Sequence, residues 1–518
     1  MMAEFGKLLY SGVSIPTWTP DGFYHFGATS FYFYPPITFY LSSIVSVVGI
    51  QDPLSLFQAV SLLGTIASFF SARWLLRTIG SSEYRSNIAA ALYACAPLRV
   101  AELYSRSSLP THVTYTFIPL VAIALIAIVR REGTSRIKRI LLLGLWCAIL
   151  ALTNVPITVM MAMAMIVAAI VVWRELRWNA VIDIMLAGAI AAGLAAYHYA
   201  SVLSAQPFSR LQDLHFSHRP QDIELYFHLG PGTYHILVLY AAVGIIVLAY
   251  TWLRWKKESL TRIESAVGRI GLSIAAIIFF LDLFPISAGV WNAFPPLQLV
   301  QFPWRFYPLD LLLGIMVIGS AQSLTLKRAA KLIAAVWIVG AVLPIILVVF
   351  SFHIFSPFVR APEDPTEYLP IYFNPSVSPE NGGMRGAVER TLRPHASDSA
   401  VLGNLQMGEK VEGVVREPYH EKYDVTLKTP RPVTFHRFYW PFWHLYASGN
   451  EVYSRPDSIG RATATFPSGH YTAVWQLERT PLEIAGLWIS GISWVGVLVF
   501  LGIGLVRRRV RAMPSSSP

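Results

Sequence analysis

Long apolar runs recur along the first two thirds of the chain and again near its end, with short polar segments between them. A transmembrane helix needs about 20 mostly apolar residues, because the hydrocarbon core of a bilayer is about 30 Å thick. Tryptophan and tyrosine gather at the ends of the runs, where they anchor helices at a membrane surface. The runs centre on Leu41, Thr65, Val121, Leu145, Ile166, Ile190, Val243, Ile274, Ile315, Ala341 and Val497. This pattern predicts an α-helical polytopic membrane protein with about 11–12 spanning helices.

The periodicity changes to a two-residue alternation in the last third of the chain. Three segments alternate in this way, Tyr423 to Lys428, Val433 to Phe438 and His470 to Leu477, and turn-forming residues lie at 448–450 and 467–469. Alternation between turns is typical of antiparallel strands. We therefore predict an extracytoplasmic β-rich domain, a small sheet or sandwich, over residues 353–481. It separates a transmembrane module over residues 1–352 from a final transmembrane helix and basic cytoplasmic tail over residues 482–518.

Composition narrows the class of protein further. The chain of 518 residues is 54% hydrophobic and 14% charged, whereas soluble globular chains are about 45–50% apolar and about 25% charged. These values exclude a soluble enzyme, and the apolar content also excludes a disordered chain. Because both cysteines, Cys95 and Cys147, lie in apolar runs, we expect neither a disulfide framework nor a thiolate metal site.

The location of the net charge of +11 indicates orientation in a membrane. Residues 353–481 hold 13 basic and 14 acidic residues, so the excess of positive charge lies in the rest of the chain. Much of it falls in short loops, at residues 130–139, 254–262 and 507–511. Basic loops of this kind stay in the cytoplasm. We predict a multi-pass protein of the cytoplasmic (inner) membrane that interacts with the lipid bilayer and binds no nucleic acid.

The topology of the first hundred residues stays open. The short run from Ile88 to Val100 contains Pro97 and Arg99, so it either lies on the membrane surface or spans with basic residues at its inner end. Residues 1–33 contain neither a spanning run nor a signal-peptide pattern. Either the true start lies upstream of Met1, or this N-terminal segment is cytoplasmic.

The first candidate for chemistry is Asp21, in a loop rich in proline and glycine. It follows the sequence Ile15-Pro-Thr-Trp-Thr-Pro and precedes an aromatic stretch, Phe31-Tyr-Phe-Tyr34-Pro-Pro, that enters the next apolar run. A proline pair can open a helix without losing useful N–H donors. A carboxylate at that place can act as a general base toward a hydroxyl. The alternative is an exposed loop aspartate without a role.

Two further stretches carry charged residues at predicted membrane boundaries. Glu102 and Arg106 are four residues apart, so on a helix they share a face and can simply pair. Arg305 follows Trp304 in the sequence Gln-Phe-Pro-Trp-Arg-Phe. Its guanidinium suits a phosphate, which it can bind through two parallel N–H groups. The alternative for Arg305 is a side chain that extends to the interface between aromatic residues.

These stretches together resemble the bacterial membrane proteins labelled "6-pyruvoyl-tetrahydropterin synthase-related", a group similar to the GT-C superfamily of membrane glycosyltransferases. The resemblance implies transfer of a sugar from a polyprenyl-phosphate carrier to an extracytoplasmic acceptor, such as a glycan, in cell-envelope synthesis. It also implies roles for six residues: Asp21 as base, Glu102 as a second acid, Arg305 and Arg106 as phosphate ligands, and Trp304 and Tyr34 beside the substrate.

The chain departs from this family in two places. The superfamily begins with a spanning helix before the acidic loop, which is missing before Asp21, and Pro110, Thr111 and His112 stand where relatives tend to have an acidic residue. Two alternatives therefore remain: a transporter or flippase for a lipid-linked substrate, and a catalytically inactive membrane scaffold that binds glycan.

We predict no cofactor, with a divalent metal as the alternative. Imidazoles and carboxylates can together hold a metal ion, although their spacing here matches no known motif. The residues concerned are His215, His218, His228, His235, Asp213, Asp222 and Glu224.

Overall fold

A computed structural model describes residues 1–96, 99, 103, 108–131, 134–209, 262–282, 287–300, 303–320, 331, 401–402, 408–457 and 460–512. They form two compact units. The first unit comprises Met1–Pro53, Ala196–Leu214 and Pro357–Ile489, and the second comprises Leu54–Ala195, His215–Ser356 and Ser490–Pro518. The N-terminal segment thus belongs with the β-rich region, a grouping that the hydrophobic pattern did not indicate.

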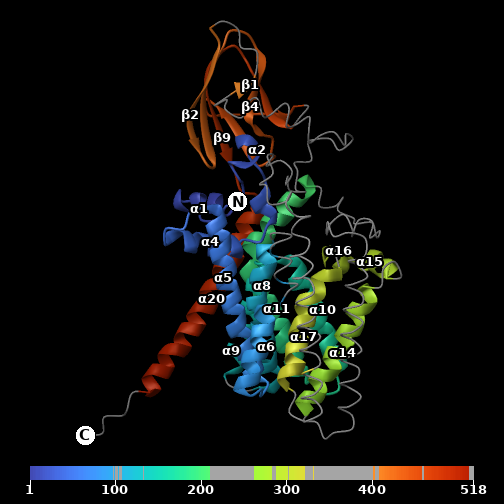
Figure 1. The fold of residues 1–518 in the computed structure, drawn as a ribbon. Helices are drawn as coiled ribbons and strands as arrows, with labels where there is room; N and C mark the ends of the chain where they lie inside the picture. Colours follow the sequence, from blue (N-terminus) through green and yellow to red (C-terminus); the bar gives the residue numbers. More distant parts are fainter. Residues whose placement is uncertain are drawn as a thin grey trace, which may run out of the picture. The chain divides into compact units, whose positions relative to one another are not determined.

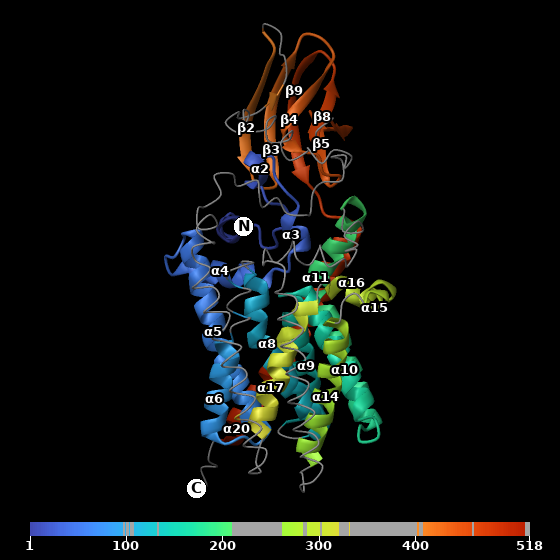
Figure 2. The same cartoon turned by 45° about the vertical axis from the view of Figure 1, so that its right-hand side comes forward.

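The second unit is built mainly from helices, and Figures 1 and 2 show α8, α9, α10, α14 and α17 running alongside one another. The helical segments are α5 (Pro53–Thr78), α6 (Glu83–Ala94), α8 (Leu109–Arg130), α9 (Arg136–Ala151), α10 (Val155–Val171), α11 (Trp178–Ala205), α14 (Arg262–Asp282), α15 (Ala288–Ala293), α16 (Pro295–Val300), η3 (Pro303–Phe306), α17 (Tyr307–Ser320) and α20 (Pro481–Ala512). The two longest, α11 and α20, extend into the first unit as well.

Four helical segments within the described ranges are long and apolar enough to cross a membrane: Pro53–Thr78, Leu109–Arg130, Trp178–Phe208 and Pro481–Phe500. The other apolar helices are shorter, among them Ile37–Val47 and Tyr307–Ser320. A helix of 11 to 14 residues is about 16–21 Å long at 1.5 Å per residue, less than the bilayer core. The runs predicted around Val243 and Ala341 lie outside the described residues.

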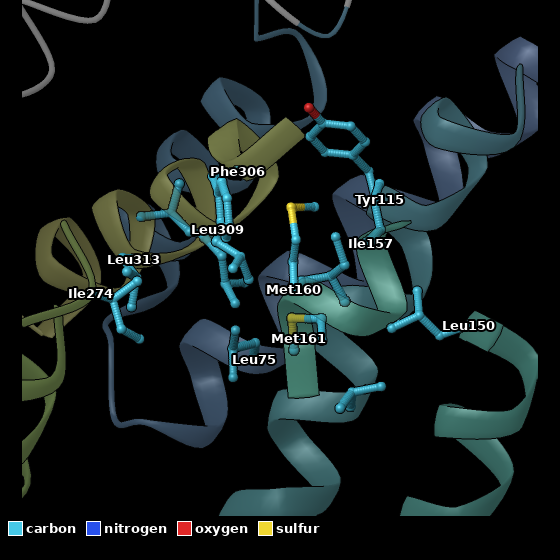
Figure 3. Close-up of a cluster of buried hydrophobic side chains, with 14 of the residues drawn as sticks. Leu75, Tyr115, Leu150, Ile157, Met160, Met161, Ile274, Phe306, Leu309 and Leu313 are labelled. Carbon is cyan, nitrogen blue, oxygen red and sulfur yellow. The ribbon is translucent and has the colours of Figure 1, made fainter. Parts of the chain in front are cut away.

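The interior of the second unit is apolar and well packed. Figure 3 shows Tyr115 of α8, Ile157 and Met160 of α10 and Phe306 of η3 in one cluster, and Met160 is fully buried. By contrast, α5 and α20 leave large apolar side chains exposed. Helices with apolar side chains on both sides are typical of a membrane-spanning bundle.

Small residues bring helices of the second unit close together. A Cβ atom added at Gly144 of α9 would lie 2.9 Å from the carbonyl oxygen of Ala187 in α11. Between α20 and α11, the Ser490 hydroxyl donates to the Gly193 carbonyl at 2.9 Å, and the Trp494 indole donates to the Leu194 carbonyl at 3.1 Å. Close approach at small residues and interhelical hydrogen bonds are the usual means of helix association in lipid.

The first unit contains a β-sandwich (Figure 1). One sheet has the order β1-β4-β8-β7 and the other β2-β3-β9-β5-β6, and neighbouring strands pair antiparallel in both. The predicted strands correspond to β3, β4 and β9, and the predicted turns follow β5 and β8. The strands are β1 (Val401–Leu402), β2 (Lys410–Glu417), β3 (His420–Leu427), β4 (Arg431–Phe438), β5 (Trp443–Ala447), β6 (Asn450–Val452), β7 (Ser454–Pro456), β8 (Arg461–Phe466) and β9 (Gly469–Leu477).

Both sheets contribute to one aromatic core. Phe435 of β4 contacts Tyr423 of β3 and Trp475 of β9, with ring centroids 5.2 and 5.3 Å apart. Trp18 and Phe26 of the N-terminal segment belong to the same cluster. The remaining helices of this unit are α1 (Met2–Tyr10), α2 (Gly22–His25), α3 (Ser30–Phe33), α4 (Ile37–Val47) and the short η1 (Gln206–Phe208).

We expect Gly144→Ala to destabilise the protein by about 1–3 kcal/mol, because the added methyl group meets rigid backbone of α11 and the helices must separate. The matched control is Gly188→Ala in α11, where an added Cβ has no neighbour within 4 Å. That change should be neutral or stabilising by up to about 1 kcal/mol, since alanine favours a helix over glycine. Thermal midpoints of the detergent-purified variants test the difference, and equal midpoints would contradict close packing at Gly144.

Candidate active site

Asp21 lies in a short loop that is closed by a pair of backbone hydrogen bonds. The Thr19 and Ala28 backbones each donate to the other, at 2.8 and 2.9 Å. The Gly27 N–H donates to the Gly22 carbonyl at 2.8 Å, which closes the loop further around α2. Asp21 is therefore held near the start of a ten-residue loop (Thr19 to Ala28) with a defined backbone.

Two glycines allow this loop to fold tightly. Gly27 has a φ of 86°, in the left-handed region, and a side chain there would overlap the indole ring of Trp18. A Cβ atom at Gly22 would lie 2.9 Å from the Cβ of Ala28. His25 also has a positive φ, at 68°; non-glycine residues in this conformation are uncommon, although histidine is among those that adopt it.

The β-sandwich holds the loop from both sides. The Tyr419 hydroxyl accepts hydrogen bonds from the backbone N–H groups of Thr17 and Trp18, the latter at 3.0 Å. On the other side, the Phe438 N–H donates to the Phe26 carbonyl at 2.8 Å, and the Phe26 ring stacks on His436 at 3.9 Å. Burial raises the pKa of Tyr419, so its hydroxyl stays protonated at neutral pH.

The Asp21 carboxylate itself stays accessible to solvent. Its side chain is 47% exposed; Oδ2 lies 3.8 Å from the Lys7 ammonium and Oδ1 lies 3.3 Å from Nδ1 of His25. Exposed ion pairs of this kind contribute little to stability. The carboxylate can therefore exchange these neighbours for a ligand at small cost, as a general base must.

A second carboxylate, that of Glu4, lies beside Asp21. Oε1 of Glu4 accepts a hydrogen bond from the Asp21 backbone N–H at 2.8 Å. Burial, opposed by this hydrogen bond and assisted by the negative charge of Asp21, raises the pKa of Glu4 to about 6. Two neighbouring carboxyl groups in different environments are the arrangement that separates an acid from a base. The sequence patterns did not identify Glu4, because it is distant from Asp21 in sequence and has no motif.

Tyr34 lies in the same unit, at the end of α3. Its backbone N–H donates to the Ser30 carbonyl at 3.1 Å, and its partly buried ring packs against a cluster formed by Phe5, Phe31 and neighbouring apolar residues of α1 and α4. Pro36 precedes α4 as its N-cap, in agreement with the predicted opening of a helix by the proline pair. Tyr34 therefore contributes to the packing beside the Asp21 loop.

Arg305 lies in the second unit, in η3 at the start of α17. Its Nη1 donates to the carbonyl of Val300 at 2.9 Å, at the end of α16. A cation at the C-terminal end of a helix is favourable, so this hydrogen bond has a local structural role. The next residue, Phe306, is buried in the core of this unit (Figure 3). This burial fixes the backbone from which the Arg305 side chain extends.

Several predicted site residues lie outside the described residues. These are Glu102, Arg106, the side chain of Trp304 and the histidine-rich segment with His215, His218, His228, His235, Asp213, Asp222 and Glu224. Among the described residues, no group of three potential metal ligands comes together. The roles assigned to these residues stay predictions.

The second unit also contains a buried polar cluster that the sequence patterns did not single out. Arg99, 1% exposed, donates to His112 from Nε at 3.2 Å and to the Ala94 carbonyl from Nη1 at 3.2 Å. Nη1 also donates to the hydroxyl of Ser68, and Nε2 of His112 lies 3.1 Å from the Thr65 hydroxyl. The sequence feature that could have identified this cluster is Arg99, a single arginine within an apolar run. An ionisable residue at such a place in a membrane protein is a candidate for a functional role.

We expect Gly27→Ala to destabilise the first unit by about 2–4 kcal/mol, because it adds both left-handed strain and overlap with the buried Trp18. Gly12→Ala is the matched control: its φ is 95°, and an added Cβ has no neighbour within 4 Å, so only the strain of about 1–2 kcal/mol remains. Thermal midpoints followed by tryptophan emission compare the two variants. Equal losses would show that Trp18 does not pack against Gly27.

We expect Glu4→Gln to change how stability depends on pH. Because the pKa of Glu4 is raised to about 6 in the folded state from 4.5, its contribution is fully present below about pH 4.5 and is lost as pH rises through about 6. Glutamine keeps the acceptor for the Asp21 N–H and removes the ionisation. The variant should therefore exceed the wild type by up to about 2 kcal/mol above pH 6 and should not exceed it below pH 4.5.

Melting curves at several pH values between 4 and 8 measure this difference. Glu417→Gln is a control, since Glu417 is an exposed residue at the turn between β2 and β3. A constant offset between wild type and Glu4→Gln over the whole range would contradict the raised pKa of Glu4.

In comparisons with family models, curated proteins and solved structures, nothing matches this chain.

Proposed function

We propose that the chain is a GT-C-like membrane glycosyltransferase that transfers a sugar from a polyprenyl-phosphate carrier to an acceptor hydroxyl outside the membrane. The observation that carries this proposal is the Asp21 carboxylate, accessible in a backbone-fixed loop with Glu4 and His25 beside it. A group of this kind meets the geometric need of a general base: it is positioned by its surroundings and open to a substrate.

In the proposed reaction, the acceptor oxygen attacks the anomeric carbon of the sugar while Asp21 accepts the hydroxyl proton. The bond between that carbon and the phosphate oxygen breaks, and the lipid phosphate leaves with the electron pair. Positive charge develops at the sugar carbon in the transition state. A carboxylate on one side and a cation at the leaving phosphate stabilise the two opposite charges.

Arg305 is proposed as the cation at the phosphate. A guanidinium has five N–H donors in a planar fork that suits a phosphate, and Nη1 of Arg305 donates to the Val300 carbonyl. That bond holds the side chain in place before substrate binds. Arg106 and Glu102 are proposed as a second phosphate ligand and a second acid, and Trp304 and Tyr34 as neighbours of the bound substrate.

We place the protein in the cytoplasmic membrane, with the β-sandwich extracytoplasmic. The four long apolar helices support membrane insertion, and the basic short loops support this orientation. The sugar donor is then an amphiphile that shares the bilayer with the enzyme, while the acceptor glycan approaches from outside.

The two alternatives differ in their support. An inactive scaffold would need exposed aromatic residues of the outer domain to bind glycan. Trp440, Trp443 and Trp475 are at most 2% exposed and belong to the core, whereas Tyr453 is 82% exposed. The transporter is favoured by one observation, the buried Arg99 and His112 cluster, because charged residues inside a membrane bundle often mark a substrate path.

We expect Asp21→Asn to lower sugar transfer about 10²–10⁴-fold, since asparagine cannot accept the proton, and Arg305→Ala to lower it about 10²-fold or more. The matched controls are Asp424→Asn in β3 and Arg455→Ala in β7, both in the sandwich. Transfer of radiolabelled sugar from polyprenyl phosphate is measured in membranes that contain equal amounts of each variant. Unchanged transfer by both site variants would overturn the assignment, and lipid movement without transfer would favour the transporter.

A further inference from the structure

Helix α4 buries three serines together with Phe39 and Val45, and it exposes aliphatic side chains at its C-terminal end. Ser42, Ser43 and Ser46 are buried, whereas Ile44, Val47 and Val48 are 66%, 72% and 76% exposed. Aliphatic residues at spacings of three and four share one face of a helix. The exposed side of α4 is therefore an aliphatic stripe, and its polar side faces the protein.

The three buried serine hydroxyls of α4 all donate hydrogen bonds, whereas the buried Thr38 hydroxyl has no partner among the described residues. The Ser42 and Ser43 hydroxyls donate to the Phe39 carbonyl at 2.8 and 2.9 Å, and that of Ser46 donates to the Ser43 carbonyl at 2.7 Å. The Tyr10 hydroxyl of α1 lies 2.7 Å from the Ser46 hydroxyl. Rotation of α4 to expose its serines would break the bond to Tyr10 and bury the aliphatic stripe against α1.

Helix α1 packs on α4 (Figure 1). Gly6 of α1 lies at this contact, where an added Cβ would be in ordinary van der Waals contact with the Ser43 hydroxyl at 3.5 Å. Phe5 stacks on Phe39 with ring centroids 5.3 Å apart. The α1–α4 pair is thus one packed element, and the aliphatic stripe lies on the side of α4 that α1 does not cover.

Three observations identify what covers the stripe. No charged residue occurs between Phe26 and Gln51, so nothing in this segment opposes transfer out of water. The helix has 11 residues, too few to cross a bilayer. Val48 is followed five residues later by Pro53, where a helix long enough to span begins; five residues of chain reach at most about 18 Å. The stripe is therefore tethered close to the entry of a candidate membrane helix.

From these observations we infer that α4 lies in the membrane interface, with Ile44, Val47 and Val48 inserted among the lipid acyl chains. A short helix with an apolar face lies in the plane of the interface, with that face about 5–10 Å into the boundary between headgroups and chains. Lipid is the occupant because the stripe is aliphatic and uncharged and because the next helix in the chain is itself a candidate membrane span.

This placement bears on the proposed function and in that respect depends on it. Helix α1 carries Glu4 and Lys7, the residues that contact Asp21. Packed helices lie about 8–10 Å apart, so Asp21 is held one helix layer from the inserted stripe. At this distance from the inserted stripe, the Asp21 carboxylate lies level with the lipid headgroups. The sugar of a lipid-linked donor lies in the same layer.

The test measures depth with spin labels in the full chain. Cys95 and Cys147 are first replaced by serine, and a label is attached at Val47→Cys or, separately, at Ile44→Cys. The protein is reconstituted in nanodiscs of phosphatidylethanolamine and phosphatidylglycerol. Val414→Cys is the matched control, an exposed valine of β2 in the sandwich. Collision rates of each label with oxygen, which concentrates in lipid, and with a water-soluble nickel chelate are compared.

We expect labels at 44 and 47 to collide with oxygen more than with nickel, at a depth of about 5–10 Å below the phosphates, and the label at 414 to show the reverse. Collision with nickel at 47 as frequent as at 414 would show that the stripe lies in water. Protection from both reagents would show that protein covers it. Either result overturns the inference, and because the measurement needs no sugar transfer, its failure is separate from a failure of the proposed function.

Discussion

The structure of the candidate site depends on one contact, the packing of the N-terminal loop against the β-sandwich. Ordering residues 17 to 28 costs conformational entropy. Contacts outside the loop must offset this cost. Trp18 and Phe26 offset that entropy by joining the aromatic core of the sandwich. The Tyr419 hydroxyl accepts the Trp18 N–H where it would otherwise be buried without a partner. Fixing these two ends leaves Asp21 exposed within an ordered loop.

The same contact explains why an accessible carboxylate can still be precisely placed. An exposed side chain is usually mobile, and its ion pairs with Lys7 and His25 are weak. The backbone beneath it, however, is held by the Thr19–Ala28 pair and by Glu4. The main chain therefore fixes the position of the Asp21 carboxylate, and its solvent exposure leaves it available to a substrate. Catalytic bases need both properties.

The parts of the fold that follow from local pattern could be predicted from sequence. Strands β3, β4 and β9 alternate cleanly, with burial of every second residue in β3, and the long helices α5, α8 and α11 follow from apolar runs. The weaker strands β2, β5 and β8 were not predicted. The run around Leu41 was misjudged as a spanning segment because hydropathy does not show where a helix ends: α4 begins after Pro36 and ends before Gly49, which leaves it too short.

The site shows a clearer limit of sequence reasoning. Asp21 was identified from its local surroundings, but Glu4 acquires its raised pKa only when α1 folds against the loop, and this is a tertiary event without a local signal. The association of residues 1–53 with a sandwich near the end of the chain is of the same kind. Its contacts include that between Trp18 and Trp443, with ring centroids 5.9 Å apart. A hydrophobic pattern predicts that such aromatic residues are buried, but it does not predict which residues they contact.

Helix α1 connects these features through its two sides. One side buries Phe5, Gly6 and Leu8, and Phe5 packs on α4; another carries Glu4 and Lys7 to Asp21. A nine-residue helix is too short to be stable alone in water, so it forms only when it packs against both partners. A shift of α4 would therefore also move the first turn of α1, and with it the carboxylates of Glu4 and Asp21. A lipid surface that holds α4 in place would in this way also fix the height of the proposed base, which links membrane insertion to catalysis.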